Sequence, residues 1–290
     1  MAHTTGELIK HGYEKLVSTS TSALLDSQVL LSHLTKKPRT WLLSHPEATV
    51  NADVENQYFN RIDQMVAGVP LPYIIGQWEF FGMTFKLTPD TLIPRPETEL
   101  LAEHALSWAH AHPRGINVLD IGTGSGCIAV ALAKHNPDIC VTALDISYAA
   151  LIVASHNAHF HKVQRRVHFV QADLRDPFPF FPKHLYQFDI ICSNPPYIPK
   201  QNLAALPVSQ YEPRYALDGG EAGIELISAL LPQAALHLNP GGLFLMEIDS
   251  SHAEKAKSLT AEYFQEAVIH LLPDLAGNDR LIMVEHPHNY

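Results

Sequence analysis

Cysteine is scarce in this sequence, and no apolar segment is long enough to cross a membrane. The three cysteines, Cys127, Cys140 and Cys192, lie far apart in apolar surroundings, and none shows the paired spacing of a zinc site. We therefore expect buried free thiols, a reducing compartment and no metal. Residues 1–16 mix charged and apolar positions as an amphipathic helix does, unlike the continuous apolar centre of a signal peptide. The sequence predicts a cytoplasmic protein with no membrane partner.

Basic residues are also in short supply. The chain has 20 lysines and arginines against 30 aspartates and glutamates, which gives a net charge of −10. Residues 1–72 hold six of the basic and seven of the acidic side chains, so most of the negative charge lies in residues 73–290. Nucleic-acid enzymes usually neutralise phosphates with lysine and arginine. The acidic balance therefore predicts that this protein does not bind nucleic acid directly.

Residues 1–72 carry apolar residues at helical spacing and show no strand pattern. Ser22 is placed to cap a helix over 23–34, and Asn51 is placed to cap another over 52–67. We predict a small all-helical domain over these 72 residues, and we expect it to recognise the substrate.

The pattern changes over residues 73–95, where aromatic and β-branched residues are interrupted by Gly76 and Gly82. Such a stretch is typical of a β-hairpin, so we predict a hairpin linker here. A helix over 97–110 should follow it and begin the third part of the chain, residues 96–290.

Apolar runs alternate with helical segments from residue 115 onward, as in a parallel sheet covered on both faces. The expected strands span 116–121, 139–144, 167–172, 188–193, 243–248, 266–272 and 280–285. Only a short turn separates the last two, so we expect them to be antiparallel. This order predicts an α/β fold, the Rossmann-like seven-stranded arrangement of class I methyltransferases.

A glycine-rich segment follows the first of these strands and precedes a helix over 127–135. Its residues are Gly122, Thr123, Gly124, Ser125 and Gly126. Glycines here let the backbone approach a ligand and present the amides of a helix N-terminus to it. A tight turn between strand and helix, with no ligand, remains the alternative for this segment taken alone.

Polar residues follow the next three strands in the same way. Asp145, Asp173 and Asn194 each come at the end of a strand, on the edge where open α/β sheets bind ligands. An acidic side chain at position 145 can accept hydrogen bonds from both hydroxyls of a ribose. A helix cap is the alternative for Asp145 alone, but the four coincidences together favour a nucleoside-binding edge.

The segment Asn194-Pro195-Pro196-Tyr197 is the sharpest chemical signal. An amide or aromatic amino nitrogen is a weak nucleophile because its lone pair is delocalised. The Asn194 side-chain carbonyl and the Pro195 backbone carbonyl can accept its two hydrogens, and the prolines hold these acceptors in place. Tyr197 can pack on the planar group, so that methyl transfer from a sulfonium needs mainly proximity and orientation. A rigid strand exit is the alternative.

Four segments resemble the peptide chain release factor glutamine N5-methyltransferases. They are residues 193–198 (SNPPYI), 68–82 with GVPLPYIIG and EFFG, 92–99 (LIPRPETE) and 211–223 with YEP, Gly219-Gly220 and Gly223. The helical front region fits as well, so the resemblance covers nearly the whole chain.

The resemblance implies S-adenosyl-L-methionine as cofactor and a role in translation termination. It places the cofactor contacts at Gly122, Thr123, Gly124, Ser125, Gly126, Asp145, Asp173, Leu174 and Asn194. It places catalysis and substrate binding at Asn194, Pro195, Pro196 and Tyr197, with Arg95 as a further substrate contact. The implied partners are class I release factors, whose target glutamine lies in a Gly-Gly-Gln loop.

Two positions depart from the family pattern, and several alternatives stay open. Leu174 replaces a frequent aromatic residue against the adenine, and Asp249 replaces the usual glycine after Glu247-Ile248. Arg95 can equally orient the linker. The main rival function is an adenine-N6 or guanine-N2 methyltransferase of nucleic acid, which needs a flipped base and usually a basic surface. A module that binds the cofactor without turnover is a third possibility.

Overall fold

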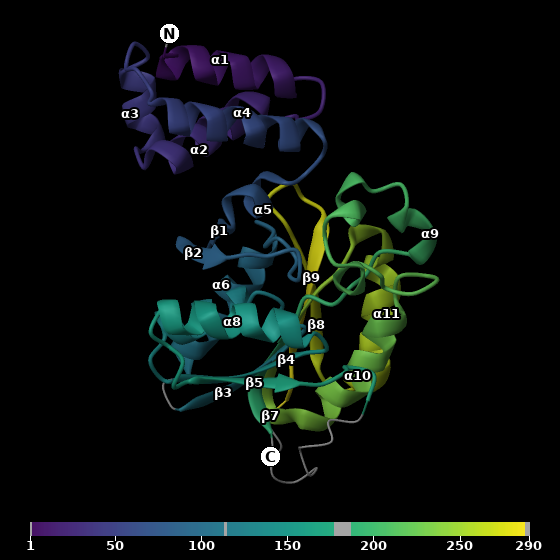
Figure 1. Cartoon of the computed structure of the whole chain (residues 1–290). Coiled ribbons are helices and arrows are strands. Elements are labelled where there is room, and N and C mark those ends of the chain that lie inside the picture. Colours follow the sequence, from purple (N-terminus) through teal and green to yellow (C-terminus); the bar gives the residue numbers. More distant parts are fainter. Residues whose placement is uncertain (1, 113–114, 177–186, 288–290) are drawn as a thin grey trace. The chain divides into compact units, whose positions relative to one another are not determined.

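A computed structural model of the chain describes residues 2–112, 115–176 and 187–287. The chain divides into two compact units, Met1–Gln77 and Trp78–Tyr290, shown in Figure 1. The boundary falls inside the stretch 73–95 that we expect to be a linker, and the three-part division of the sequence remains a prediction.

The first unit consists of helices, as predicted. They are α1 (Thr5–Leu16), α2 (Ala23–Thr35), α3 (Arg39–Ser44), α4 (Ala52–Val66) and α5 (Leu71–Ile75). The side chain of Asn51 accepts a hydrogen bond of 2.8 Å from the Val54 amide and caps α4. Ser22 occupies the N-cap position of α2, as predicted, but its side chain makes no capping hydrogen bond; its hydroxyl donates to Asp26 at 3.0 Å.

The predicted hairpin is shorter than expected and begins later. Its strands are β1 (Gln77–Phe80) and β2 (Met83–Lys86), which form a two-stranded sheet of their own. The first expected hairpin residues, 73–75, belong instead to α5, which has Pro72 in its first turn and ends at Gly76 with φ +72°. Proline is favoured in the first turn of a helix, and glycine is favoured at the left-handed position that ends it. Together they override the β-propensity of the residues between them.

The second unit contains the seven-stranded sheet. Its strands are β3 (Ile116–Ile121), β4 (Ile139–Asp145), β5 (Val167–Gln171), β6 (Phe188–Ser193), β7 (Leu238–Glu247), β8 (Val268–Pro273) and β9 (Asp279–Glu285). The spatial order is β5-β4-β3-β6-β7-β9-β8. The first five strands are parallel, and β9 pairs antiparallel with both β7 and β8. This confirms the predicted class I methyltransferase arrangement.

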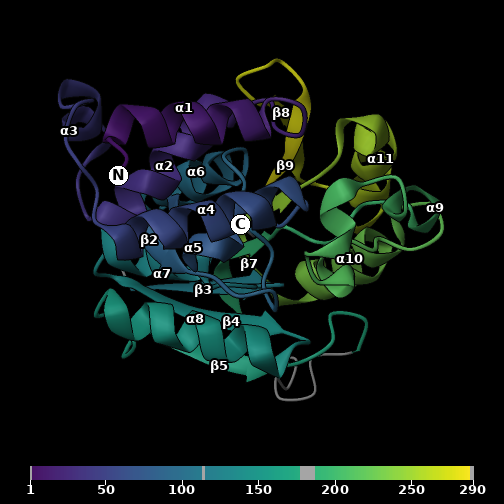
Figure 2. The same ribbon diagram turned by 45° about the horizontal axis from the view of Figure 1, so that its top comes forward.

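Helices cover both faces of this sheet (Figures 1 and 2). On one face α6 (Thr98–Ala111), α7 (Cys127–His135) and α8 (Tyr148–Phe160) pack on one apolar cluster. On the other face α10 (Glu225–His237) and α11 (Ala253–Tyr263) pack on a second cluster. Successive strand residues such as Val118 and Leu119 point into opposite clusters, because side chains alternate along a strand. Both faces of the central strands are therefore buried.

Short helical segments complete the second unit: α9 (Lys200–Leu203) and the 3-10 turns Pro207–Gln210, Arg214–Ala216 and Ser250–His252. α10 begins at Glu225, shortly after Gly223, which adopts φ +79°. The Glu225 carboxylate then accepts the amides of Ala222 and Ile224 at 2.9 and 3.0 Å.

One of the three thiols is not buried. Cys127 and Cys192 are buried as expected, whereas Cys140 is exposed. Exposure alternates along the first residues of β4, and Cys140 occupies one of the exposed positions. In the described part of the chain, no helix has the length and apolar character that a membrane span requires.

Candidate active site

A cavity of about 530 Å³ opens at the carboxyl ends of β3, β4, β5 and β6. The strand register brings these ends together, because Ile121 of β3 pairs with Leu144 of β4 and with Ser193 of β6. The sequence-predicted residues that line the cavity are Gly122, Gly124, Asp145, Asp173, Leu174, Asn194 and Pro196. Thr123, Ser125, Gly126, Pro195, Tyr197 and Arg95 lie outside its lining.

The three glycines after β3 have different roles. Gly122, Gly124 and Gly126 have φ values of +77°, +55° and +79°, which glycine adopts without strain. A Cβ on Gly124 would meet no atom within 4 Å, so its backbone faces open space. A Cβ on Gly126 would lie 3.0 Å from the Cβ of Ala154 in α8. Gly124 therefore exposes backbone to the cavity, whereas Gly126 permits close helix packing.

Two hydroxyl residues of this turn are buried inside the protein. Thr123 is 4% exposed, and its hydroxyl donates to the Asp120 carboxylate at 2.6 Å. Ser125 is 2% exposed. Burial raises the pKa of Asp120 to about 7. Thr123 thus supports the turn through Asp120, and neither Thr123 nor Ser125 reaches the cavity.

Asp145 links the glycine turn to the start of α8. One carboxylate oxygen accepts the Gly124 amide and the other accepts the Ser147 amide, both at 2.8 Å. Burial raises its pKa, and these backbone hydrogen bonds oppose the rise. Each carboxylate oxygen has a second lone pair, so Asp145 can still accept from a ligand in the cavity.

Asp173 and Leu174 lie beyond β5 on the cavity wall. The Asp173 carboxylate binds the Arg175 guanidinium, with an Nε to Oδ1 distance of 2.9 Å. The hydrogen bonds from Arg175 hold the pKa of Asp173 below its usual value. Leu174 packs against the apolar cluster under α10 and also lines the cavity. An acidic and an apolar side chain thus stand next to each other on the cavity wall.

Asn194 and Tyr197 are both tied to a buried carboxylate. The Asn194 side-chain amide donates to the Thr98 hydroxyl at 3.1 Å, and the Thr98 hydroxyl donates to Glu247 at 2.6 Å. The Tyr197 hydroxyl donates to the other oxygen of Glu247 at 3.2 Å. Burial raises the pKa of both Tyr197 and Glu247.

The loop beyond the motif packs directly on its backbone. The Ile198 amide donates to the Leu217 carbonyl at 3.1 Å, and the Gly219 amide donates to the Ile198 carbonyl at 2.9 Å. A Cβ on Gly219 would lie 2.7 Å from the Cα of Tyr197, and a Cβ on Gly223 would lie 2.5 Å from the Tyr197 carbonyl oxygen. These glycines therefore allow the loop to support the motif.

Arg95 forms an ion pair with the buried carboxylate of Glu212, which belongs to the loop beyond the motif. Its guanidinium lies 2.5 Å from one oxygen of Glu212, and the other oxygen accepts the Ile93 amide at 3.1 Å. Glu212 is 3% exposed. The ion pair orients the segment before α6, and a substrate contact by Arg95 remains a prediction.

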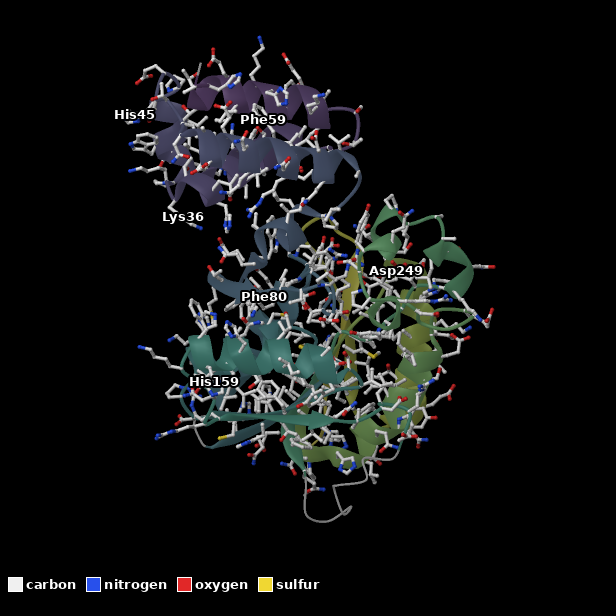
Figure 3. All side chains as sticks on the ribbon, in the orientation of Figure 1. Lys36, His45, Phe59, Phe80, His159 and Asp249 are labelled. Atoms are coloured by element: carbon white, nitrogen blue, oxygen red, sulfur yellow. The ribbon has the colours of Figure 1, made fainter. Side chains whose placement is uncertain are left out.

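Asp249 sits in a defined turn. Its carboxylate accepts the Ser251 amide at 2.9 Å and begins the 3-10 turn Ser250–His252. Figure 3 labels Asp249, which follows β7 in the chain. The departure from glycine is therefore accommodated by a side-chain cap.

Three features of the site escaped the sequence analysis. Tyr215 lines the cavity, and its hydroxyl donates to the Asp90 carbonyl at 2.6 Å and lies 3.0 Å from the Ser147 hydroxyl. Thr98 contacts Asn194, and Glu247 contacts Tyr197, although the members of each pair lie far apart in the chain. Thr98 and Glu247 stand inside quoted motifs, but neither motif indicates that they meet.

Comparisons with known proteins agree with this geometry. Residues 7–76 match the family model described as PrmC N-terminal domain, and residues 97–208 match the Methyltransferase small domain. The chain is 40% identical over 270 residues to a release factor glutamine methyltransferase of Koribacter versatilis, covering 92% of both chains. It is 38% identical over 260 residues to one from Moorella thermoacetica, covering 89% of this chain and 90% of that one.

A solved structure supports the fold. A methyltransferase from Pyrococcus furiosus superposes with a TM-score of 0.51 at 20% identity, covering 79% of this chain and 98% of that one. At this identity the likeness shows the shared class I methyltransferase fold.

Proposed function

The chain belongs to the release factor glutamine methyltransferase family, and from this membership we propose that it methylates the side-chain amide nitrogen, N5, of a glutamine. The proposed substrate is the Gly-Gly-Gln loop of class I peptide chain release factors, and S-adenosyl-L-methionine is the methyl donor. We propose that this activity modulates translation termination and takes place in the cytoplasm. The observation that supports it most is the position of Asn194 and Pro196 on a cavity built like a nucleoside site.

The residues around the cavity fit the proposed donor. Gly122 and Gly124 bring backbone to its wall in conformations that leave no side chain in the way. Asp145 keeps free lone pairs for ribose hydroxyls, and Leu174 offers an apolar surface for a base. The donor supplies an electrophilic methyl group on a sulfonium. We propose Thr123, Ser125, Gly126 and Asp173 as supports of this site, because they hold the turn and the wall.

The motif beyond β6 orients the nucleophile. The Asn194 side-chain carbonyl and the Pro195 backbone carbonyl accept the two hydrogens of the target amide, which turns its nitrogen toward the methyl group. Tyr197 packs on the planar amide. When bound, the donor would supply its methyl carbon to this nitrogen with cleavage of the carbon–sulfur bond, and the proton of the nitrogen would pass to water. No strong base is needed, so proximity and orientation carry the rate.

A labelling experiment tests the function. The protein is incubated with donor labelled in its methyl group, with intact release factors and, separately, with bulk nucleic acid. Label in the target glutamine of the release factor is the expected result, located by mass spectrometry of the loop peptide. Label in nucleic acid and none in release factor would favour the rival amino-group methyltransferase and overturn the proposal.

A further inference from the structure

Three hydrogen bonds join the catalytic motif to one buried carboxylate. They run from the Asn194 amide to the Thr98 hydroxyl, from Thr98 to Glu247, and from Tyr197 to Glu247, at 3.1, 2.6 and 3.2 Å. Thr98 begins α6, Glu247 ends β7, and the motif follows β6. Thr98 is 3% exposed and Glu247 is 2% exposed. Among Asn194, Thr98 and Glu247, only Asn194 lines the cavity.

The direction of these hydrogen bonds is determined by chemistry. The Thr98 hydroxyl donates to Glu247, and a hydroxyl has a single hydrogen. The Thr98 hydrogen points to Glu247, so Thr98 can only accept from Asn194. Asn194 must therefore turn its NH₂ group toward Thr98, which leaves its carbonyl oxygen on the other side. A flipped amide would place a donor where the target nitrogen needs an acceptor.

We propose that Thr98 and Glu247 are positioning residues that select the productive orientation of the Asn194 amide. This inference rests on the proposed function, in which the Asn194 carbonyl accepts a hydrogen from the target nitrogen. The Glu247 carboxylate also accepts a hydrogen bond from the Tyr197 hydroxyl. This one buried group therefore holds the first residue of the motif through Thr98 and the last residue directly.

Neither residue has a simpler structural use that accounts for the contact. Thr98 stands at the first position of α6, but its hydroxyl donates to Glu247 and accepts from the Asn194 side-chain amide instead of accepting from a helix amide. Glu247 is a buried carboxylate, and burial costs free energy that an apolar side chain would avoid. Burial raises its pKa, while Thr98, Tyr197 and Arg280 oppose the rise and Glu97 adds to it. The hydroxyls of Thr98 and Tyr197 satisfy its two oxygens.

The test compares Thr98→Val, which keeps the shape and removes the hydroxyl, with Thr98→Ser, which restores it. We expect Thr98→Val to lower the single-turnover rate at saturating cofactor about tenfold or more, because orientation errors are costly. Thr98→Ser should stay within about threefold of the parent, and cofactor affinity should change little in both. Thr260→Val is the matched control, because it removes a buried hydroxyl that bonds to the Ala256 carbonyl of its own helix.

Glu247→Gln provides a second variant. Its amide can donate to Thr98, which frees the Thr98 hydrogen for the Asn194 carbonyl and permits the flipped orientation. We expect Glu247→Gln to lower the single-turnover rate by roughly fivefold or more. The Thr98→Val/Glu247→Gln double variant should be no slower than the slower of the two single variants. Losses that multiply would show that the two residues do not act as one chain and would overturn the proposal.

A measurement without substrate separates this inference from the proposed function. The side-chain amide protons of Asn194 are observed by NMR with isotope-labelled asparagine and assigned by their absence from Asn194→Ala. They should exchange slowly with solvent in the parent and in Thr98→Ser, and faster in Thr98→Val. A parent that labels no release factor contradicts the function alone. Equal exchange, or an equal rate, in Thr98→Val and the parent contradicts the positioning role.

Discussion

Asn194 is the single residue whose loss should cost most activity. It lines the cavity and supplies the carbonyl that we expect to orient the target nitrogen. Removing one such preorganised contact lowers a rate by about a hundredfold or more. Asn194→Ala should therefore show almost no methyl transfer in single-turnover assays at saturating cofactor. A rate above half that of the parent would contradict the mechanism.

Asp145 should act on cofactor binding more than on chemistry. Asp145→Ala removes an acceptor for the ribose hydroxyls and is expected to weaken cofactor binding by about 1–3 kcal/mol. The rate at saturating cofactor should stay close to that of the parent. Calorimetry measures the affinity, and Asp138→Ala, an exposed position, serves as the control. Unchanged affinity would leave Asp145 only its hydrogen bonds to Gly124 and Ser147.

Asp120 should make the stability of the protein depend on pH. Burial raises its pKa to about 7 in the fold, whereas an unfolded aspartate titrates near ~3.9. Between these values the folded chain holds a proton that the unfolded chain has lost. The free energy of unfolding therefore falls as pH rises, by up to about 1.4 kcal/mol per pH unit, and levels off above about pH 7.

Asp120→Asn removes this titration. The stability of the variant relative to the parent should therefore rise from about pH 4 to about pH 7 and then stay constant. Urea unfolding across this range measures the difference, with the exposed Asp138→Asn as the control. A difference that does not change with pH would show that Asp120 is ionised throughout.

At the scale of elements, most of the predicted bounds lie within one or two residues of those observed, whereas β7 begins at Leu238, ahead of the expected 243–248. The bounds of β3, β6 and α7 coincide with the predicted ranges, because continuous apolar runs between turn residues leave little choice. The start of α10 depends on the conformation of Gly223 and on the Glu225 side chain, which are capping details that an apolar pattern does not show. Residues 73–75 became helical because the flanking proline and glycine outweigh β-propensity.

The sequence predicted only those parts of the site that lie at the ends of strands. The glycine turn, Asp145 and Asn194 follow strands directly, so the sheet topology alone brings them to one edge. The contact between Thr98 and Glu247 joins residues 149 positions apart, and no periodicity reveals such a pairing. Tyr215 reaches Asp90 across 125 positions for the same reason.

The loop that carries Gly219 should be essential to the shape of the motif. Gly219→Ala places a Cβ within 2.7 Å of the Tyr197 Cα, so loop or motif must shift. We expect methyl transfer to fall about tenfold or more, since small displacements near the reacting group are costly. Gly115→Ala, whose added Cβ would meet nothing within 4 Å, is the matched control. Equal rates for Gly219→Ala and Gly115→Ala would show that the loop does not support catalysis.

At the scale of the whole molecule, the cavity residues and the helical region occupy different parts of the chain. The residues that line the cavity run from Asp90 to Ala229, so all of them belong to the second unit. The first unit has its own buried core, including Leu8, Leu31 and Tyr58. The first unit contains none of the proposed cofactor residues. We therefore propose that its apolar helices recognise the folded protein substrate.

A truncated chain that begins at Tyr73 tests this division. It keeps the hairpin and every cavity residue, so cofactor affinity should remain within about twofold of the parent once folding is confirmed by circular dichroism. Methylation of intact release factor should fall about tenfold or more in kcat/KM, because binding energy remote from the reacting group helps to position it. A short Gly-Gly-Gln peptide should be a poor substrate for both chains, since it lacks the surface that the helical unit would bind. If the folded truncated chain methylates intact release factor as efficiently as the parent, the helical unit does not recognise the substrate.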